Sequence, residues 1–394
     1  MTQQILNPRR VLIALAIGAF GIGTTEFTPM GLLPVIADGV GVSIPSAGLL
    51  ITAYAIGVMV GAPIMTLLFS RFGKRAALMA LMAIFTLGNL LSALSPDYYS
   101  LLAARLVTSL NHGAFFGLGA VVAASVVPKD KQASAVATMF MGLTIANIGG
   151  VPAATWLGQQ IGWRMAFAGT AMLGLLAMLA LWYALRRGER GSVPHVRKEL
   201  AVIARSDVLL AMATTVLGAG AMFTLYTYVA PVLAELAAAS ERFVTLGLVL
   251  IGVGFTLGNS LGGRLADWSL DGAARICLAA LAVIMLAMPL VLGSHLGAAV
   301  ALLVWGVFTF AVVPPLQMRV MTAAADAPGL ASSINVGAFN LGNAVGAALG
   351  GAVISLDLGY AAVPMAGGVL AAAALLLVWL GARRQMARPQ PDRA

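Results

Sequence analysis

Twelve apolar stretches, each about twenty residues long and bounded by short polar breaks, dominate this 394-residue sequence. They lie at approximately 11–33, 46–69, 76–95, 98–126, 133–157, 162–185, 207–234, 243–266, 273–293, 297–320, 330–356 and 359–382. As a helix, each is long enough to cross a hydrocarbon core of about 30 Å. Only 9% of the residues are charged, against roughly 25% in soluble domains. We therefore expect an all-α membrane protein with twelve transmembrane helices.

The positions of the basic residues predict the orientation of these spans. If the N-terminus is cytoplasmic, 20 of the 23 Lys and Arg residues fall in cytoplasmic segments. Arg164 and Arg242 then lie in outer loops, and Arg105 lies within a span. This asymmetry follows the positive-inside rule. The net charge of +9 thus indicates membrane orientation rather than a nucleic-acid surface, and we expect a bacterial inner-membrane protein with both termini in the cytoplasm.

A polar segment around residues 186–207 separates six spans from six, which suggests an internal duplication. Pro34 precedes Ser70 by the same number of residues as Pro231 precedes Asp267. We expect an N-terminal six-helix bundle (1–186), a cytoplasmic linker (187–206) and a C-terminal six-helix bundle with a short tail (207–394). Two such pseudo-symmetric halves around a central site are a known plan of transporters.

Several motifs resemble the major facilitator superfamily, and within it the bacterial drug:proton antiporter group. The loop "TLLFSRFGKRAAL" is similar to the family signature after span two, with Ser70 where the family has aspartate. The segment "GGRLADWSLDGAAR" resembles its second-half copy, "RLVTSLNHGAFFG" the span-four element, and "ANIGGVPAATWLG" the antiporter element of span five. The opening "TTEF…GLLP" most resembles the sugar-efflux and arabinose-efflux-permease-like branch. The resemblance covers the whole chain.

The resemblance implies a set of residues that change conformation during transport. These are Arg71, Gly73, Lys74, Arg75, Gly149, Gly150, Pro152, Gly263 and Asp267. The absence of the family aspartate at Ser70 puts the latch of the first half in question. Independently of the resemblance, proline bends span five by removing a backbone hydrogen bond. That bend either biases which side of the protein opens or is a static kink.

Away from their ends the spans hold few ionisable groups, namely Glu26, Arg105 and His112. Charges within a membrane are costly and normally face a cavity or a partner. Arg105 and His112 share one face of span four, and Glu26 lies at a similar depth in span one. Desolvation favours a protonated carboxyl group and a nearby guanidinium favours the ionised form. We therefore predict that these three residues couple protons to transport.

Structural roles are the alternatives for the same three residues. Glu26 is then a permanently neutral acid that bonds to Thr24 or Thr25. Arg105 is then a clamp on backbone carbonyls between spans, and His112 a packing residue. By the duplication, Phe223 takes the place of Glu26 in the second half, so only one half carries the acid.

The substrate surface is expected to be largely apolar, because Met and aromatic side chains repack around varied shapes. The predicted lining residues are Met30, Asn111, Phe115, Asn147, Tyr226, Trp305, Asn335 and Phe339. Trp305 has an alternative role as an interfacial anchor. Asn147, Asn340 and Asn343 have an alternative role in hydrogen bonds between helices.

The leading functional hypothesis is a monomeric antiporter that exports a small amphipathic drug or metabolite in exchange for protons, by alternating access. Efflux of sugars or nucleoside-like metabolites and proton-coupled uptake are the alternatives within transport. A membrane enzyme needs paired carboxylates, a metal-ligand cluster or a nucleophile and base, and this sequence does not supply them. The single cysteine, Cys277, excludes a disulfide framework and a cysteine metal cluster. We expect no cofactor and no metal.

Overall fold

The computed structural model describes residues 7–42, 44–186 and 201–386, and all regular elements in these ranges are helical. Twelve helical stretches among them are long and apolar enough to cross a membrane. This confirms the expected all-α class and the number of spans. Most of the expected linker, residues 187–200, lies outside the described ranges.

Contacts between Cα atoms divide the chain into two units. Unit 1 comprises Met1–Glu199 with Ala327–Asn340, and unit 2 comprises Leu200–Asp326 with Leu341–Ala394. Unit 1 contains α1 (Pro8–Gly39), α2 (Ile44–Phe69), α3 (Lys74–Leu94), α4 (Tyr98–Ser125), η1 (Lys129–Lys131), α5 (Gln132–Ile145), η2 (Ala146–Gly150), α6 (Val151–Ile161) and α7 (Trp163–Ala184). Unit 2 contains α9 (Ser206–Tyr226), α10 (Val229–Ala237), α11 (Glu241–Trp268), α12 (Leu270–Ala287), η3 (Met288–Leu290), α13 (His295–Ala311), α14 (Val313–Ala323) and α16 (Ala362–Met386).

The helix α15 (Pro328–Ser355) contributes to both units. Its first part, up to Asn340, groups with unit 1, and the remainder groups with unit 2. The division into two six-helix bundles at residues 186 and 207 therefore stays a prediction.

Polar residues at the span ends start the helices. Asn7 accepts hydrogen bonds from the first backbone N–H groups of α1, and Asp97 forms a capping box with Ser100 at the start of α4. Ser269 and Ser294 cap α12 and α13 in the same way. Such side chains satisfy N–H groups that have no partner within the helix.

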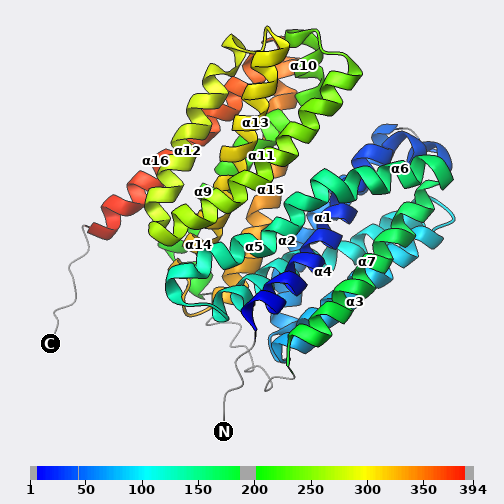
Figure 1. The fold of residues 1–394 in the computed structure, drawn as a ribbon, viewed down its shortest axis with the longest axis vertical. Coiled ribbons are helices and arrows are strands. Elements are labelled where there is room, and N and C mark those ends of the chain that lie inside the picture. Colours follow the sequence, from blue (N-terminus) through cyan, green and yellow to red (C-terminus); the bar gives the residue numbers. More distant parts are fainter. Residues whose placement is uncertain (1–6, 43, 187–200, 387–394) are drawn as a thin grey trace. The chain divides into compact units, whose positions relative to one another are not determined.

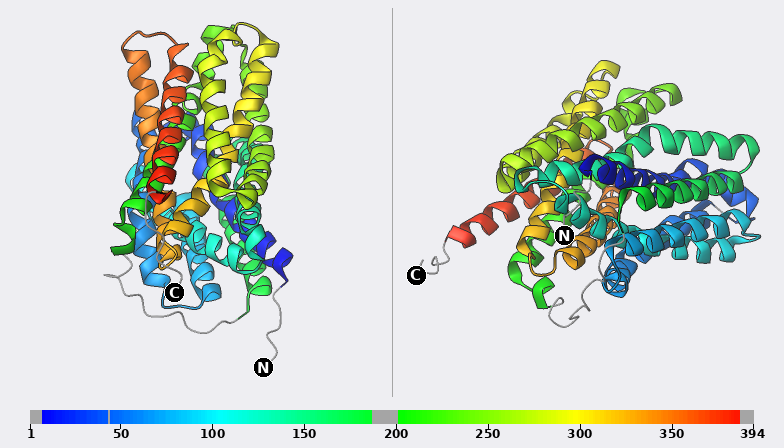
Figure 2. Two further views of the ribbon diagram at one scale, coloured as in Figure 1. Left: turned by 90° about the vertical axis from the view of Figure 1, so that its left-hand side faces the viewer. Right: turned by 60° about the horizontal axis from the view of Figure 1, so that its bottom comes forward.

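The same helix pairings occur within each unit. In unit 1, α2 packs on α4, α3 packs on α7, and α1 packs on α5 and α7 (Figure 1). In unit 2, α11 packs on α13, and α16 packs on both α9 and α12. The left panel of Figure 2 shows the long helices of unit 2, in yellow to red, running along a common direction. The repeated pairings support the expected duplication.

Close packing in unit 2 depends on a glycine stripe on α11. Gly254, Gly258 and Gly262 lie four residues apart, and a Cβ at any of them would overlap with backbone atoms of α13. The carbonyl oxygens of Leu303, Val307 and Ala311 are the atoms that would be met. Small residues at this spacing let two membrane helices approach closely.

Within the described residues, the fifth, seventh and tenth spans contain breaks in the α-helix, which the apolar windows did not predict. The fifth span contains the π-helix η2 between α5 and α6. The seventh breaks between α9 and α10, and the tenth breaks at Val312, directly before α14 with Pro314 and Pro315. Proline explains the last break, because it cannot donate a backbone hydrogen bond.

Candidate functional site

Glu26 lies in the C-terminal half of α1 and is half-buried. Its carboxylate makes no hydrogen bond or close ion pair with any residue in the described ranges. The hydroxyl of Thr24 donates to the carbonyl of Phe20 at 2.8 Å, and that of Thr25 donates to Asn89 Oδ1 at 2.5 Å. The alternative in which Thr24 or Thr25 bonds to the acid is therefore wrong, and the carboxyl group is left open to a proton or a ligand.

Arg105, on α4, reaches the residue next to Glu26. Its Nη1 donates to Thr25 Oγ1 at 3.2 Å, and only 1% of the residue is exposed. The guanidinium carbon lies 4.3 Å from the centre of the Tyr54 ring and 5.8 Å from that of Phe167. Nε and Nη2 have no hydrogen-bond partner within the described part of the chain. The alternative of a clamp on backbone carbonyls is wrong, because the hydrogen bond of Arg105 is to a side chain.

His112 lies two turns after Arg105 on α4, and is buried. Its Nδ1 is 3.1 Å from the hydroxyl of Tyr54, and its ring centre is 5.2 Å from that of Phe116. Tyr54 thus contacts both Arg105 and His112, which do not contact each other through a hydrogen bond. Sequence reasoning missed Tyr54 and Asn89, because neither residue carries the charge that singles out an intramembrane site.

The other residues of α4 that the sequence predicts for the site, Asn111 and Phe115, are also buried. Phe115 is fully buried against Gly18 of α1, where a Cβ would overlap with its ring. Both polar atoms of the Asn111 carboxamide are buried without a hydrogen-bond partner in the described ranges. Met30 belongs to α1, but its side chain lies outside what the structure describes.

The π-helix η2 packs against the turn of α1 that precedes Glu26. A Cβ at Gly150 would overlap with Thr24 and Phe20, whereas a Cβ at Gly149 would meet no other atom within 4 Å. Asn147 Nδ2 donates to the carbonyl of Leu143, and Asn340 likewise donates to Val336 of its own helix. These bonds lie within one helix, so the alternative of glue between helices is wrong for both asparagines. Pro152 follows directly, at the start of α6.

The first part of α15 supplies Asn335 and Phe339, both within unit 1. Asn335 is fully buried and Phe339 is half-buried. The same segment contacts α2, where the Thr66 hydroxyl donates to Ser333 Oγ at 2.6 Å.

In unit 2, Tyr226 and Trp305 belong to an aromatic cluster. Their ring centres lie 6.3 Å apart, and each lies within 6.2 Å of Phe255, which stacks on Phe310 at 4.1 Å. Trp305 has no exposed surface, so its alternative role as an interfacial anchor is wrong. Its indole N–H has no hydrogen-bond partner among the residues that the structure describes.

The signature loop of unit 1 contains no acid to pair with its basic residues. The Ser70 hydroxyl donates to Leu67 O of its own helix at 2.7 Å. Arg71 and Lys74 are exposed, Gly73 caps α3, and Arg75 lies 4.0 Å from the ring centre of Trp182. The basic residues of this loop therefore lie at the end of the bundle and form no ion pair with an acid of the same loop.

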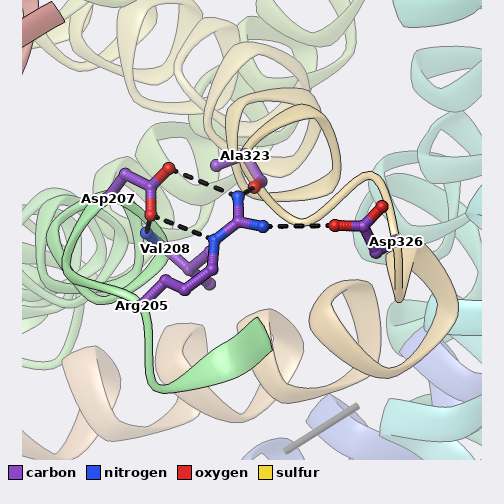
Figure 3. Close-up of polar contacts among 5 residues, drawn as sticks. All are labelled: Arg205, Asp207, Val208, Ala323 and Asp326. Atoms are coloured by element: carbon purple, nitrogen blue, oxygen red, sulfur yellow. Dashed lines mark hydrogen bonds and ion pairs between the residues drawn. The ribbon is translucent and has the colours of Figure 1, made fainter. Parts of the chain in front are cut away.

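The corresponding segment of unit 2 has the acids that the signature loop of unit 1 lacks. Gly263 and Asp267 lie in the last turns of α11, and Asp271 Oδ1 pairs with Arg319 Nε at 2.8 Å. Figure 3 shows Arg205 between Asp207 of α9 and Asp326 after α14; it also donates to the Ala323 carbonyl. The Asp207 carboxylate raises the pKa of Arg205 above its usual value. Unit 2 therefore has ion pairs at this end, and none is found among the described residues of unit 1.

Nothing in this arrangement resembles a metal centre. Within residues 7–42, 44–186 and 201–386, no three His, Cys, Asp or Glu side chains come together. Cys277 is buried with a free thiol.

Comparison with known proteins places the geometry in context. A family model described as "Major Facilitator Superfamily" matches residues 15–335. The "Inner membrane transport protein YdhP" of Escherichia coli (strain K12) is 67% identical over 374 residues, which cover 95% of this chain and 96% of the relative. The "Chloramphenicol resistance protein" of Streptomyces lividans is 32% identical over 376 residues, with 93% and 95% covered. The solved structure of the human organic anion transporter MFSD10 (TETRAN) has a TM-score of 0.77 at 16% identity, and covers 94% of this chain and 99% of its own.

Proposed function

The chain belongs to the Major Facilitator Superfamily, and we propose that it is a proton-coupled antiporter that exports a small amphipathic drug or metabolite by alternating access. Its membership makes it a membrane transporter rather than an enzyme. The observation that carries the proposal is that Glu26 and Arg105 lie close together without an ion pair between them in the described ranges. Glu26 is the half-buried acid of α1 without a bond to the described residues, and Arg105 is a buried guanidinium bonded to the adjacent Thr25.

A carboxyl group in this setting can hold a proton or face a substrate. Burial favours its neutral form, and a nearby cation favours its charged form. Movement of Arg105, or arrival of a substrate, therefore changes whether Glu26 is protonated. A site that holds either a proton or a substrate, and faces each side in turn, exchanges one for the other. One charge that moves through 100 mV supplies about 2.3 kcal/mol, which is enough to drive export.

We place the transporter in the bacterial inner membrane as a monomer, with both termini in the cytoplasm. The distribution of basic residues supports this orientation. The relative that is 67% identical is named an inner membrane transport protein, which supports this location.

Several residues are proposed to contact the substrate. Asn111 and the aromatic cluster of unit 2 carry buried polar atoms without partners in the described ranges, such as the N–H of Trp305. Buried polar atoms of this kind are expected to bond to water or to a ligand. Within unit 1, Asn111, Asn147 and Asn335 offer polar groups to a solute, and within unit 2 the aromatic cluster offers mainly apolar rings. The chloramphenicol resistance relative supports export of a drug.

Two alternatives remain within transport. Efflux of a sugar or nucleoside-like metabolite is favoured by the motif resemblance to the sugar-efflux branch. Uptake by symport differs in direction, since substrate and proton then cross the membrane together.

A thermal-shift screen over amphipathic drugs, sugars and nucleosides identifies a ligand, and reconstitution into proteoliposomes then tests the coupling. We expect an imposed pH gradient to drive accumulation of that ligand against the proton flow. Glu26→Gln should abolish the driven accumulation, while exchange at equal pH persists. Asp38→Asn, an exposed acid at the end of the same helix, is the matched control. Gradient-driven accumulation that survives unchanged in Glu26→Gln overturns the proposal.

A further inference from the structure

A chain of three hydrogen bonds joins α4, α1 and α3 beside Glu26. Arg105 Nη1 donates to Thr25 Oγ1 at 3.2 Å, and Thr25 Oγ1 donates to Asn89 Oδ1 at 2.5 Å. Asn89 Nδ2 donates to the Phe85 carbonyl at 2.9 Å. Thr25 and Asn89 have no exposed surface, and Arg105 is 1% exposed.

The chemistry of the groups determines the direction of each bond. The Phe85 carbonyl can only accept, so the amide nitrogen of Asn89 points to it and the amide oxygen points to Thr25. The single hydroxyl proton of Thr25 is used on that oxygen. The Thr25 oxygen is therefore left to accept from Arg105, which can only donate. Asn89 thus orients the Thr25 hydroxyl, and Thr25 holds the guanidinium.

Aromatic rings hold the same guanidinium through its face. Tyr54 and Phe167 lie 4.3 Å and 5.8 Å from the guanidinium carbon. A cation over an aromatic ring is attracted by the ring's negative face. Arg105 is thereby held on Thr25 and on these rings, with no ion pair to the neighbouring carboxylate of Glu26 within the described ranges.

We propose that Thr25 and Asn89 are positioning residues that keep Arg105 apart from Glu26 and so favour the protonated form of that carboxyl group. This inference rests on the proposed function of Glu26 as the proton site. A hydrogen bond between ions is roughly twice as strong as one between neutral groups. Without the tether, pairing with the ionised carboxylate is the stronger alternative for the guanidinium. The paired form favours the ionised acid, which then binds a proton only at lower pH.

Few other charged or titratable groups lie on the helices packed around α1. Among the residues that the structure describes, α2 contributes Tyr54, and α4 contributes Arg105 and His112 beyond its first turn. The helices α5 and α6 and the π-helix η2 contain no titratable side chain. The charged and titratable residues of α3 and α7 lie near their ends. Lys74 and Arg75 are in the first turn of α3, Arg164, which donates to Ser95 O, is at the start of α7, and Tyr183 is in its last turn.

The protonation of Glu26 can be followed without a substrate. In an infrared titration of the purified protein, the C=O band of its protonated carboxyl is the band that Glu26→Gln removes. Thr25→Val keeps the shape of the side chain but cannot accept the bond from Arg105. We expect it to lower the midpoint of the band by about 0.5 to 1 pH unit, because a net hydrogen bond is worth roughly that much. Asn89→Leu should also lower the midpoint, although Asn89 lies on α3 and makes no direct bond to Arg105.

Two variants control for loss of shape or of a buried hydroxyl. Thr25→Ser keeps the oxygen and should retain the wild-type midpoint. Thr28→Val removes another buried hydroxyl of α1, which donates to Thr24 of its own helix, and should also leave the midpoint unchanged. Unchanged midpoints in both Thr25→Val and Asn89→Leu overturn the positioning role. A second outcome separates the two proposals. If Thr25→Val and Asn89→Leu lower the midpoint but transport does not respond to the pH gradient, then Thr25 and Asn89 do position Arg105, and the proposed proton coupling is rejected.

Discussion

The guanidinium of Arg105 lies over the ring of Tyr54, with 4.3 Å between the guanidinium carbon and the ring centre. The hydroxyl of that ring is 3.1 Å from Nδ1 of His112. One tyrosine of α2 therefore contacts both Arg105 and His112 of α4, the first through the face of its ring and the second through its hydroxyl. The two contacts can be separated by substitution.

Tyr54→Phe should keep the face beneath Arg105 and remove the partner of His112. Loss of a partner for a buried polar group costs about 1–3 kcal/mol. Tyr54→Leu removes the aromatic face too, and should cost about 1 kcal/mol more. Thermal unfolding in detergent should rank the wild type above Tyr54→Phe and that variant above Tyr54→Leu. Equal melting temperatures for the two variants would show that the face contributes nothing.

The cap of α4 should make stability depend on pH in the acid range. The backbone N–H of Ser100 donates to Asp97 and holds the pKa of that carboxyl below its usual range. A group with a lowered folded-state pKa stabilises the protein above its unfolded value of about 3.9, and loses this effect as the pH falls through the folded value. Asp97→Asn should therefore be less stable than the wild type at pH 7, and the difference should shrink as the pH falls below about 4. A difference that stays constant in unfolding curves from pH 7 to pH 3 contradicts this account.

The glycine stripe of α11 should tolerate no side chain. Gly258→Ala places a Cβ against the Val307 carbonyl, and backbone atoms cannot turn aside as a side chain can. Overpacking of this kind costs about 1–3 kcal/mol. Gly293→Ala, which meets no atom within 4 Å, is the control. Both variants are compared with the wild type by thermal unfolding, and equal stability of the two would reject close packing of α11 on α13.

The contacts of Arg205 with three partners at once should require a guanidinium group. Arg205→Lys keeps the charge but cannot bond to Asp207, Asp326 and the Ala323 carbonyl together. We expect this variant to have a lower melting temperature than the wild type at low salt. Raising the salt concentration should lower its melting temperature by less than that of the wild type. Arg264→Lys, at an exposed position of α11, should behave as the wild type. An unchanged salt response in Arg205→Lys would show that the ion pairs add no stability.

The fold was predictable from the sequence because hydrophobic length alone identifies membrane spans. The windows located all twelve, with ends that differ from those of the helices by a few residues in most cases. The π-helix of the fifth span and the break between Tyr226 and Val229 were not predicted, because apolar windows do not register how the backbone bonds internally. The passage of α15 from one unit to the other is a property of packing and has no signal in the sequence.

The candidate site was predictable only in its charged members. Glu26, Arg105 and His112 stand out because charges within a membrane are rare. Tyr54 and Asn89 become part of the site through packing of α2 and α3 on α4, which composition does not reveal. Their hydroxyl and amide groups also occur at many positions that have no functional role. The separation of Arg105 from Glu26 depends on these two neutral residues and on Thr25.

Proton release on ligand binding tests most directly the claim that Glu26 holds either a proton or the substrate. The purified protein is mixed, in weakly buffered detergent solution, with the ligand found in the thermal-shift screen, and a pH indicator reports the protons released. The account predicts that the wild type and Asp38→Asn release protons on binding, and that Glu26→Gln binds the ligand without release. Equal release from Glu26→Gln and the wild type would contradict it.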